Sequence, residues 1–298
     1  MLHEKEIVMC LKIKHVKKSY GDKTVLDDIN LELDSGLYGF LGANGVGKST
    51  LFKIISRYIT DYTGTVVYPK KNRNAAVEIG FLPQNFGGYP DMKVDEFLLY
   101  LGSIKSNASP KTILRDIDEK VELFNLTEFR QKKLKKLSGG QLRRVGLAQA
   151  FQLNPKIILL DEPTTGLDPT ERIKFKNYLT EIGREQIILL STHIVTDLEI
   201  IAKKIFILKD HNFVMTGSEK DLINQCFGMV WEAEFQSEID LHKIASNRTI
   251  SMVYSVGTKT KARVISDTPP TPTAVKVIPT LNDVYLINFE KEAGFHAI

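Results

Sequence analysis

Short runs of apolar residues alternate with segments of helical spacing along the first two thirds of the chain. Three continuous apolar runs are typical of strands buried on both faces of a parallel sheet: Leu37–Leu41, Ile157–Leu160 and Ile187–Leu190. After the first run, apolar residues from Leu51 to Tyr58 recur at i, i+3, i+4 and i+7, which predicts a helix. This alternation of strand and helix predicts an α/β fold.

The pattern changes in the middle of this region. Apolar residues at helical spacing predict two amphipathic helices, over Val94–Leu101 and Ile113–Phe124. Ser109-Pro110 supplies a cap and a first-turn proline for the second helix. We therefore expect a mostly helical insert over about residues 85–155 of the α/β domain.

A second boundary is predicted near Gly217. Three stretches beyond it resemble strands: Met229–Phe235, Ile250–Val256 and Ala262–Ile265. The proline-rich segment Thr268–Thr273 interrupts them with a turn or linker. We expect residues 1–217 to form the main domain and residues 218–298 a small β-containing accessory domain.

Composition excludes several classes of protein. The longest unbroken apolar run, Phe97–Leu101, is far shorter than the roughly 20 residues of a membrane-spanning helix. The first six residues include two acids where a signal peptide has basic residues. Cys10 and Cys226 are too few for a disulfide scaffold, which favours a reducing compartment. A net charge of +4 gives no reason to expect a nucleic-acid partner.

The first chemical motif is Gly42-Ala-Asn-Gly-Val-Gly-Lys-Ser49, which fits the phosphate-loop pattern G-x-x-x-x-G-K-[ST]. Its glycines allow backbone N–H groups to surround phosphate oxygens at a helix N-terminus. Lys48 is expected to reach the β- and γ-phosphates, and Ser49 to bind Mg²⁺. The alternative, a glycine-rich turn with a solvated lysine, leaves the flanking strand and helix unexplained. The predicted nucleotide-binding residues here are Gly42, Asn44, Gly45, Gly47, Lys48, Ser49 and Thr50.

The second motif is the apolar run that ends in Asp161 and Glu162. Parallel strands present their carboxyl ends to the ligand crevice. We expect Asp161 to bind Mg²⁺ and Glu162 to act as a general base toward water. A strand that simply enters a polar turn is the alternative, which the upstream phosphate loop disfavours.

The third motif is Leu137-Ser-Gly-Gly-Gln141. Ser138 and Gln141 fit a capping box that begins a helix through Leu142, Val145 and Ala148. A capped helix start with two glycines is also an anion-binding site. We therefore include Ser138, Gly139, Gly140 and Gln141 among the candidate nucleotide-binding residues.

From about residue 11 to 217 the sequence resembles the ATP-binding-cassette (ABC) ATPases, in which these motifs stand in the same order. The resemblance implies a P-loop NTPase cassette with a helical subdomain, which hydrolyses ATP with Mg²⁺. It also implies that two cassettes pair head to tail, so that the Ser138–Gln141 segment of one closes over ATP held by the other. The second ATP-binding subunit is then another copy or a sister chain.

The resemblance assigns roles to four further residues. Tyr20 matches the aromatic residue that stacks on adenine, and His193 matches the histidine that contacts the γ-phosphate. Gln84 matches the glutamine that touches Mg²⁺ and water and senses the membrane partner. Asp168 matches the loop at the dimer interface, and it also suits a helix N-cap before Pro169. The implied catalytic residues are Glu162, His193 and Gln84, and the implied metal ligands are Ser49, Gln84 and Asp161.

The C-terminal segment Pro279–Leu286 is similar to the Pro-Thr-Leu-Glu-Asp-Val-Phe-Leu ending of separate ATPase subunits of bacterial exporters, with departures at Asn282 and Tyr285. A plain amphipathic segment is the alternative. We expect an ATPase subunit that powers a separate permease from the cytoplasmic face of the membrane. An importer ATPase, or a soluble ABC ATPase acting on ribosomes or nucleic acid, remains the other possibility. The basic stretch Arg130–Lys136 is expected to be a solvated helical face.

Overall fold

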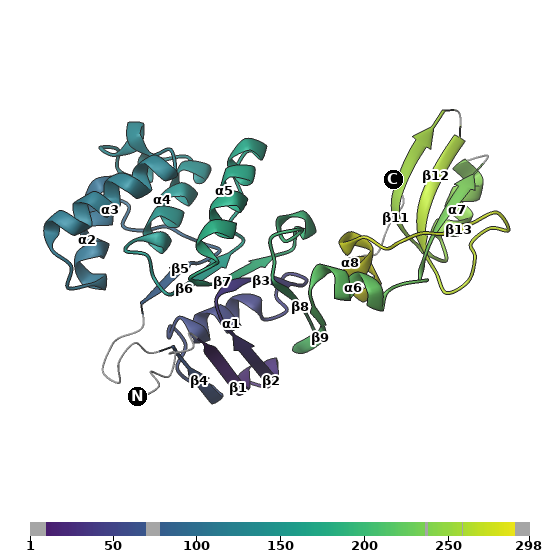
Figure 1. Cartoon of the computed structure of the whole chain (residues 1–298), viewed down its shortest axis with the longest axis horizontal. Helices are drawn as coiled ribbons and strands as arrows, with labels where there is room; N and C mark the ends of the chain where they lie inside the picture. The colour runs from purple at the N-terminus through teal and green to yellow at the C-terminus, as the bar shows by residue number, and fades with distance from the viewer. Residues whose placement is uncertain (1–9, 70–77, 236–237, 258, 290–298) are drawn as a thin grey trace, which may run out of the picture.

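The computed structural model describes residues 10–69, 78–235, 238–257 and 259–289 (Figure 1). A six-stranded sheet of order β5-β6-β7-β3-β8-β9 forms its centre. The strands are β3 (Gly36–Leu41), β5 (Ile79–Leu82), β6 (Ile157–Asp161), β7 (Ile187–Thr192), β8 (Lys204–Lys209) and β9 (Asn212–Gly217). All neighbours pair in parallel except β8 and β9. Every residue of β3, β6 and β7 is buried, which confirms the three predicted strands.

A smaller antiparallel sheet has the order β2-β1-β4. Helix α1 shares one apolar core with this sheet and with the central sheet. Its strands are β1 (Leu11–Tyr20), β2 (Lys23–Leu33) and β4 (Thr63–Val67), and α1 spans Lys48–Ile55. The predicted extension of α1 to Tyr58 is wrong, because Arg57 adopts a φ of +63° and ends the helical path. Tyr58 is consequently 79% exposed.

The helical insert contains α2 (Val94–Lys105), α3 (Pro110–Leu123) and α4 (Gly139–Phe151), followed after β6 by α5 (Pro169–Ile182). Both amphipathic helices are confirmed, and the Ser109 hydroxyl accepts the Thr112 N–H at 3.2 Å as the predicted cap. The insert packs on the central sheet through one apolar core.

The prediction of a solvated helical face at Arg130–Lys136 is wrong about the helix and confirmed for the exposure, since Lys132, Lys133, Lys135 and Lys136 are exposed. The stretch forms a loop that ends in the 3-10 turn Leu134–Lys136. Another 3-10 turn, Thr127–Phe129, comes directly before it. Acids bordering α2 and α3 pair with it: Arg130 lies 2.9 Å from Asp95, and Lys135 lies 2.5 Å from Asp91. These ion pairs hold the exposed loop against α2.

A four-stranded sheet of order β11-β12-β10-β13 lies at the C-terminal side. The remaining elements are α6 (Glu219–Gln225), β10 (Val230–Phe235), α7 (Glu238–Ala245), β11 (Thr249–Val256), β12 (Lys259–Ile265), β13 (Val275–Lys276) and α8 (Leu281–Phe289). The three predicted strands are confirmed, and the sheet has a small core of its own around Phe235 and Val264. The alternation differs at one end, since Val230 is fully buried.

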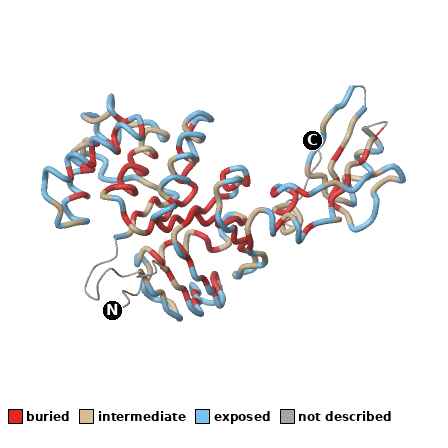
Figure 2. Tube along the Cα trace, in the orientation of Figure 1, coloured by how far each residue is buried: buried red, intermediate tan, exposed pale blue. Residues whose placement is uncertain are grey.

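Helices α6 and α8 join the accessory sheet to the rest of the molecule (Figure 1). Leu222 and Cys226 of the α6 segment, with Leu281 and Val284 of α8, belong to the main apolar core. Figure 2 shows buried positions concentrated in the central sheet and more exposed positions over the accessory sheet. The domain boundary at Gly217 stays a prediction. Among the described helices, none combines the length and apolar character needed to cross a bilayer.

Candidate functional site

The loop from Gly42 to Ser49 connects β3 to α1, and its glycines are sterically required. A Cβ at Gly42 would lie 2.6 Å from the Leu208 carbonyl oxygen, and one at Gly47 would lie 2.8 Å from that of Val25. Gly47 also has a φ of +119° at the N-cap of α1. The sequence thus turns the chain tightly from strand to helix, which leaves the helix N-terminus as an anion site.

The Lys48 side chain is buried and folds back over this loop. Its ammonium donates to the carbonyl oxygens of Gly42 at 2.5 Å and Ala43 at 3.0 Å. Burial lowers the pKa of Lys48, and the carboxylates of Glu162 and Asp161 partly oppose that effect. The Lys48 ammonium therefore lies over the loop, beside the position where a phosphate would be held.

The acids at the end of β6 are both buried, and each has a partner from the β7 end. The Ser191 hydroxyl donates to the Asp161 carboxylate. The Nδ1 atom of His193 lies 2.9 Å from Glu162 Oε1. The Glu162 backbone has a φ of +52°, which is uncommon for a residue other than glycine. Its N–H donates to the Ser191 carbonyl at 2.9 Å.

The phosphate loop, Gln84 and the two acids share one cleft of about 110 Å³. The cleft is lined by Asn44, Gly45, Gly47, Lys48, Ser49, Thr50, Gln84, Asp161 and Glu162. The fold therefore brings together the phosphate loop, the glutamine and the acids, which lie more than 30 residues apart in sequence. The hydroxyl of Ser49, the amide of Gln84 and the carboxylate of Asp161 are hard oxygen donors, so this set fits Mg²⁺.

Several predicted residues are not among the described residues that line this cleft: Gly42, His193, Tyr20, Ser138–Gln141 and Asp168. Gly42 begins the loop, and His193 is joined to the cleft through Glu162. Tyr20 ends β1 and is half exposed, with the Lys18 ammonium 4.7 Å from its ring. Ser138 caps α4 through the predicted capping box, in which the Ser138 N–H donates to Gln141 Oε1 at 3.0 Å. Asp168 caps α5 by accepting the Glu171 N–H at 2.8 Å.

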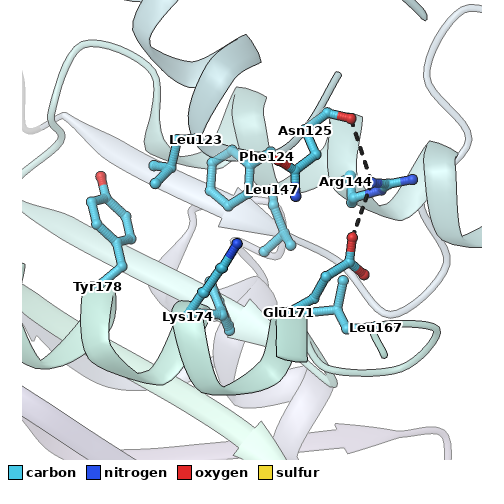
Figure 3. Close-up of a pocket in the computed structure, with 10 residues that line it drawn as sticks. Leu123, Phe124, Asn125, Arg144, Leu147, Leu167, Glu171, Lys174 and Tyr178 are labelled. Carbon is cyan, nitrogen blue, oxygen red and sulfur yellow. Dashed lines mark hydrogen bonds and ion pairs between the residues drawn. The ribbon is translucent and has the colours of Figure 1, made fainter. Parts of the chain in front are cut away.

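The starts of α4 and α5 approach each other at two glycines. A Cβ placed on Gly140 would lie 2.9 Å from the Gly166 carbonyl oxygen. Nearby, Arg144 and Glu171 form an ion pair at 3.0 Å beside a small, largely apolar pocket between α3, α4 and α5 (Figure 3). Sequence spacing did not predict this contact between the two helices.

Sequence reasoning also missed the residues that support the cleft. Asp197 is buried and accepts the hydroxyls of Thr164 at 2.5 Å and Thr192 at 3.3 Å. Arg143 is buried beneath the ends of β5 and β6. These residues have no motif of their own, and their partners are remote in sequence.

Comparisons with known proteins give a consistent result. A family model described as ABC transporter matches residues 26–165. An uncharacterised ABC transporter ATP-binding protein, YhaQ of Bacillus subtilis, is 30% identical over 244 residues, which are 80% of this chain and 81% of the relative. The lipopolysaccharide export system ATP-binding protein LptB of Haemophilus influenzae is 31% identical over 72% of this chain and 92% of its own.

A third relative and a solved structure extend this picture. The linearmycin resistance ATP-binding protein LnrL of Bacillus subtilis is 30% identical over 73% of this chain and 72% of its own. Among solved structures, the dimeric structure of a bacterial ABC transporter cassette matches with a TM-score of 0.64 at 27% identity, over 70% of this chain and 98% of that chain.

Proposed function

Because the chain belongs to the family of ABC transporter ATP-binding proteins, which bind and hydrolyse ATP, we propose that it powers a separate membrane permease that exports its substrate. The observation that carries the proposal is the cleft in which the phosphate loop meets Gln84, Asp161 and Glu162, with His193 hydrogen-bonded to Glu162. Export is favoured because relatives named for export or drug resistance align over more than two thirds of the chain.

The geometry of the cleft supports the following proposed roles. Lys48 and the loop N–H groups hold the ATP phosphates. Ser49, Gln84 and Asp161 would hold Mg²⁺, which when bound supplies positive charge beside the phosphates. Glu162 accepts a proton from the attacking water, and His193 orients the Glu162 carboxylate by the hydrogen bond at 2.9 Å.

We propose that the second wall of the ATP site comes from another cassette. Ser138–Gln141 lie at the start of α4 and are not among the described residues that line the phosphate cleft of their own chain. Tyr20 and Asp168 keep their proposed roles, at the adenine and at the dimer interface. A second copy or a sister chain would present its own α4 start to the open cleft.

Size-exclusion chromatography with Mg·ATP tests this pairing. Glu162→Gln removes the proposed base and keeps the shape of the side chain, so we expect ATP to persist and the dimer to accumulate. Glu181→Gln, an exposed glutamate at the end of α5, is the matched control and should leave the elution profile unchanged. A Glu162→Gln variant that stays monomeric with saturating Mg·ATP contradicts the proposed dimer.

The permease is tested by purification from membranes. A tagged chain should co-purify with a protein that has several membrane spans. It should be located at the cytoplasmic face of the membrane. Recovery of the chain without any such partner, under conditions that preserve other transporters, would refute the proposed transport function while leaving ATP hydrolysis intact.

A further inference from the structure

Arg143 occupies an unusual position for a cation. It lies in the second turn of α4 and is only 7% exposed. One terminal nitrogen donates to the carbonyl oxygens of Pro83 at 2.7 Å and Gln84 at 3.0 Å. The other donates to the carbonyl of Glu162 at 2.7 Å and to that of Asp161.

This arrangement is costly as a purely structural device. Taking a guanidinium out of water is expensive, and an apolar side chain would fill a core position at lower cost. Among the residues that the structure describes, the buried Nε atom of Arg143 has no hydrogen-bond partner. Burial also lowers the pKa of Arg143, although the Asp161 and Glu162 carboxylates oppose this.

The four acceptors explain what the side chain achieves. Strands β5 and β6 pair in parallel, and their pairing ends at Leu82 and Leu160. Beyond that point the two segments separate: the one after β5 leads to Gln84, and the one after β6 leads to Glu162. The Arg143 guanidinium bridges these two segments where the hydrogen bonds between the strands end, because its two terminal nitrogens donate in different directions from one plane.

We infer that Arg143 is a positioning residue that sets the placement of Gln84 and Glu162 and ties both to helix α4. Ser138 caps the N-terminus of the same helix. A shift of α4 on pairing with a second cassette would therefore be transmitted through Arg143 to the segments that carry Gln84 and Glu162. This inference rests on the proposed roles of Gln84 and Glu162.

Steady-state ATPase kinetics test it with three variants. Arg143→Ala should lower kcat about 100-fold, the loss expected for a displacement of about 1 Å at the reacting groups, with KM for ATP changed less than about threefold. Within the described part of the chain, the hydrogen bonds of Arg143 go to Pro83, Gln84, Asp161 and Glu162 rather than to the phosphate loop, so binding of a fluorescent ATP analogue should persist. Arg143→Lys should recover only part of kcat, because one ammonium does not span both chains. Arg144→Met removes a neighbouring cation of α4 and is the matched control.

Chemical rescue separates positioning from general damage. Millimolar methylguanidinium should raise kcat of Arg143→Ala at least several-fold and should leave Arg143→Lys unchanged. Unchanged kcat in Arg143→Ala, or parallel losses of kcat and nucleotide binding in both Arg143 variants without rescue, would overturn the inference. The proposed function fails separately, if the wild-type chain does not hydrolyse Mg·ATP or if Glu162→Gln remains fully active.

Discussion

The ion pair between Arg263 of β12 and Asp283 of α8 connects the accessory sheet to the main core. Arg263 Nη2 lies 2.6 Å from Asp283 Oδ2, and the two side chains are 16% and 1% exposed. Because Asp283 is almost fully buried, Arg263→Ala would leave an uncompensated carboxylate. Breaking a buried pair by removing one partner typically costs about 3–5 kcal/mol.

The lower end of that range applies to this site. Asp283 also accepts the Thr280 N–H at 2.7 Å and the Thr280 hydroxyl at 2.9 Å, and both bonds survive the substitution. We therefore expect Arg263→Ala to lower the free energy of unfolding of the accessory segment by about 3 kcal/mol. With a urea m-value of about 1–3 kcal/mol/M, the unfolding midpoint should fall by at least about 1 M.

The assay uses the only tryptophan in the chain. Trp231 lies in β10 and its indole N–H donates to the Ser266 carbonyl at 2.8 Å, so its fluorescence reports on the accessory sheet. Lys259→Ala is the matched control on the same strand. Its partner Glu234 is 2.6 Å away, but the two side chains are 63% and 37% exposed, so a much smaller change is expected.

The effect should depend on pH. Burial raises the pKa of Asp283, but its bonds with Arg263 and Thr280 outweigh burial and lower that pKa overall. A carboxyl whose pKa is lower in the folded state stabilises the fold above its unfolded pKa, and this stabilisation is lost as pH falls. The gap between wild type and Arg263→Ala should therefore be wide at pH 7 and narrow below about pH 4. Equal midpoints for Arg263→Ala and Lys259→Ala at pH 7 would refute this reasoning.

Two further predictions concern the contact between α4 and α5. Gly140→Ala places a Cβ 2.9 Å from the Gly166 carbonyl and should lower the melting temperature, whereas Gly139→Ala meets nothing within 4 Å and should not; equal melting temperatures would show that the loop adjusts. A double-mutant cycle of Arg144→Met and Glu171→Gln should give a coupling energy of about 1 kcal/mol, since the side chains are 19% and 21% exposed, and additive effects on urea unfolding would show that the pair contributes nothing.

The parts of the site that sequence predicts are those fixed by local rules. The phosphate loop needs its glycines for backbone reasons, and buried parallel strands bring their carboxyl ends to one edge. These two rules suffice to place Lys48 and Asp161 in one cleft, whereas Gln84 is assigned to it only by the resemblance to the ABC ATPases. The cap at Ser138 is equally local, because a capping box depends on two residues three positions apart.

The parts that sequence misses depend on partners far along the chain. The periodicity of α1 continues to Tyr58, but a left-handed residue at Arg57 ends the helix, which apolar spacing does not reveal. Val230 is buried against the alternation at the end of β10, where β12 pairs on one side and the Val277 N–H donates to the Val230 carbonyl at 3.1 Å on the other. Arg143 appears to be one more polar residue of α4 until its four carbonyl acceptors are located.

The C-terminal segment has a structural consequence that its strand pattern alone does not suggest. Helix α8 packs against the 3-10 turn Val195–Asp197, which directly follows His193. Asp197 in that turn accepts the Thr192 hydroxyl, and Thr192 lies 3.5 Å from the Glu162 carboxylate. The accessory sheet, held to α8 by Arg263, is thereby joined through packed elements to the backbone that carries His193. Loss of this sheet should therefore affect the site by freeing the turn, while the phosphate loop, which packs closely against Val25 of β2 and Leu208 of β8, keeps its own support.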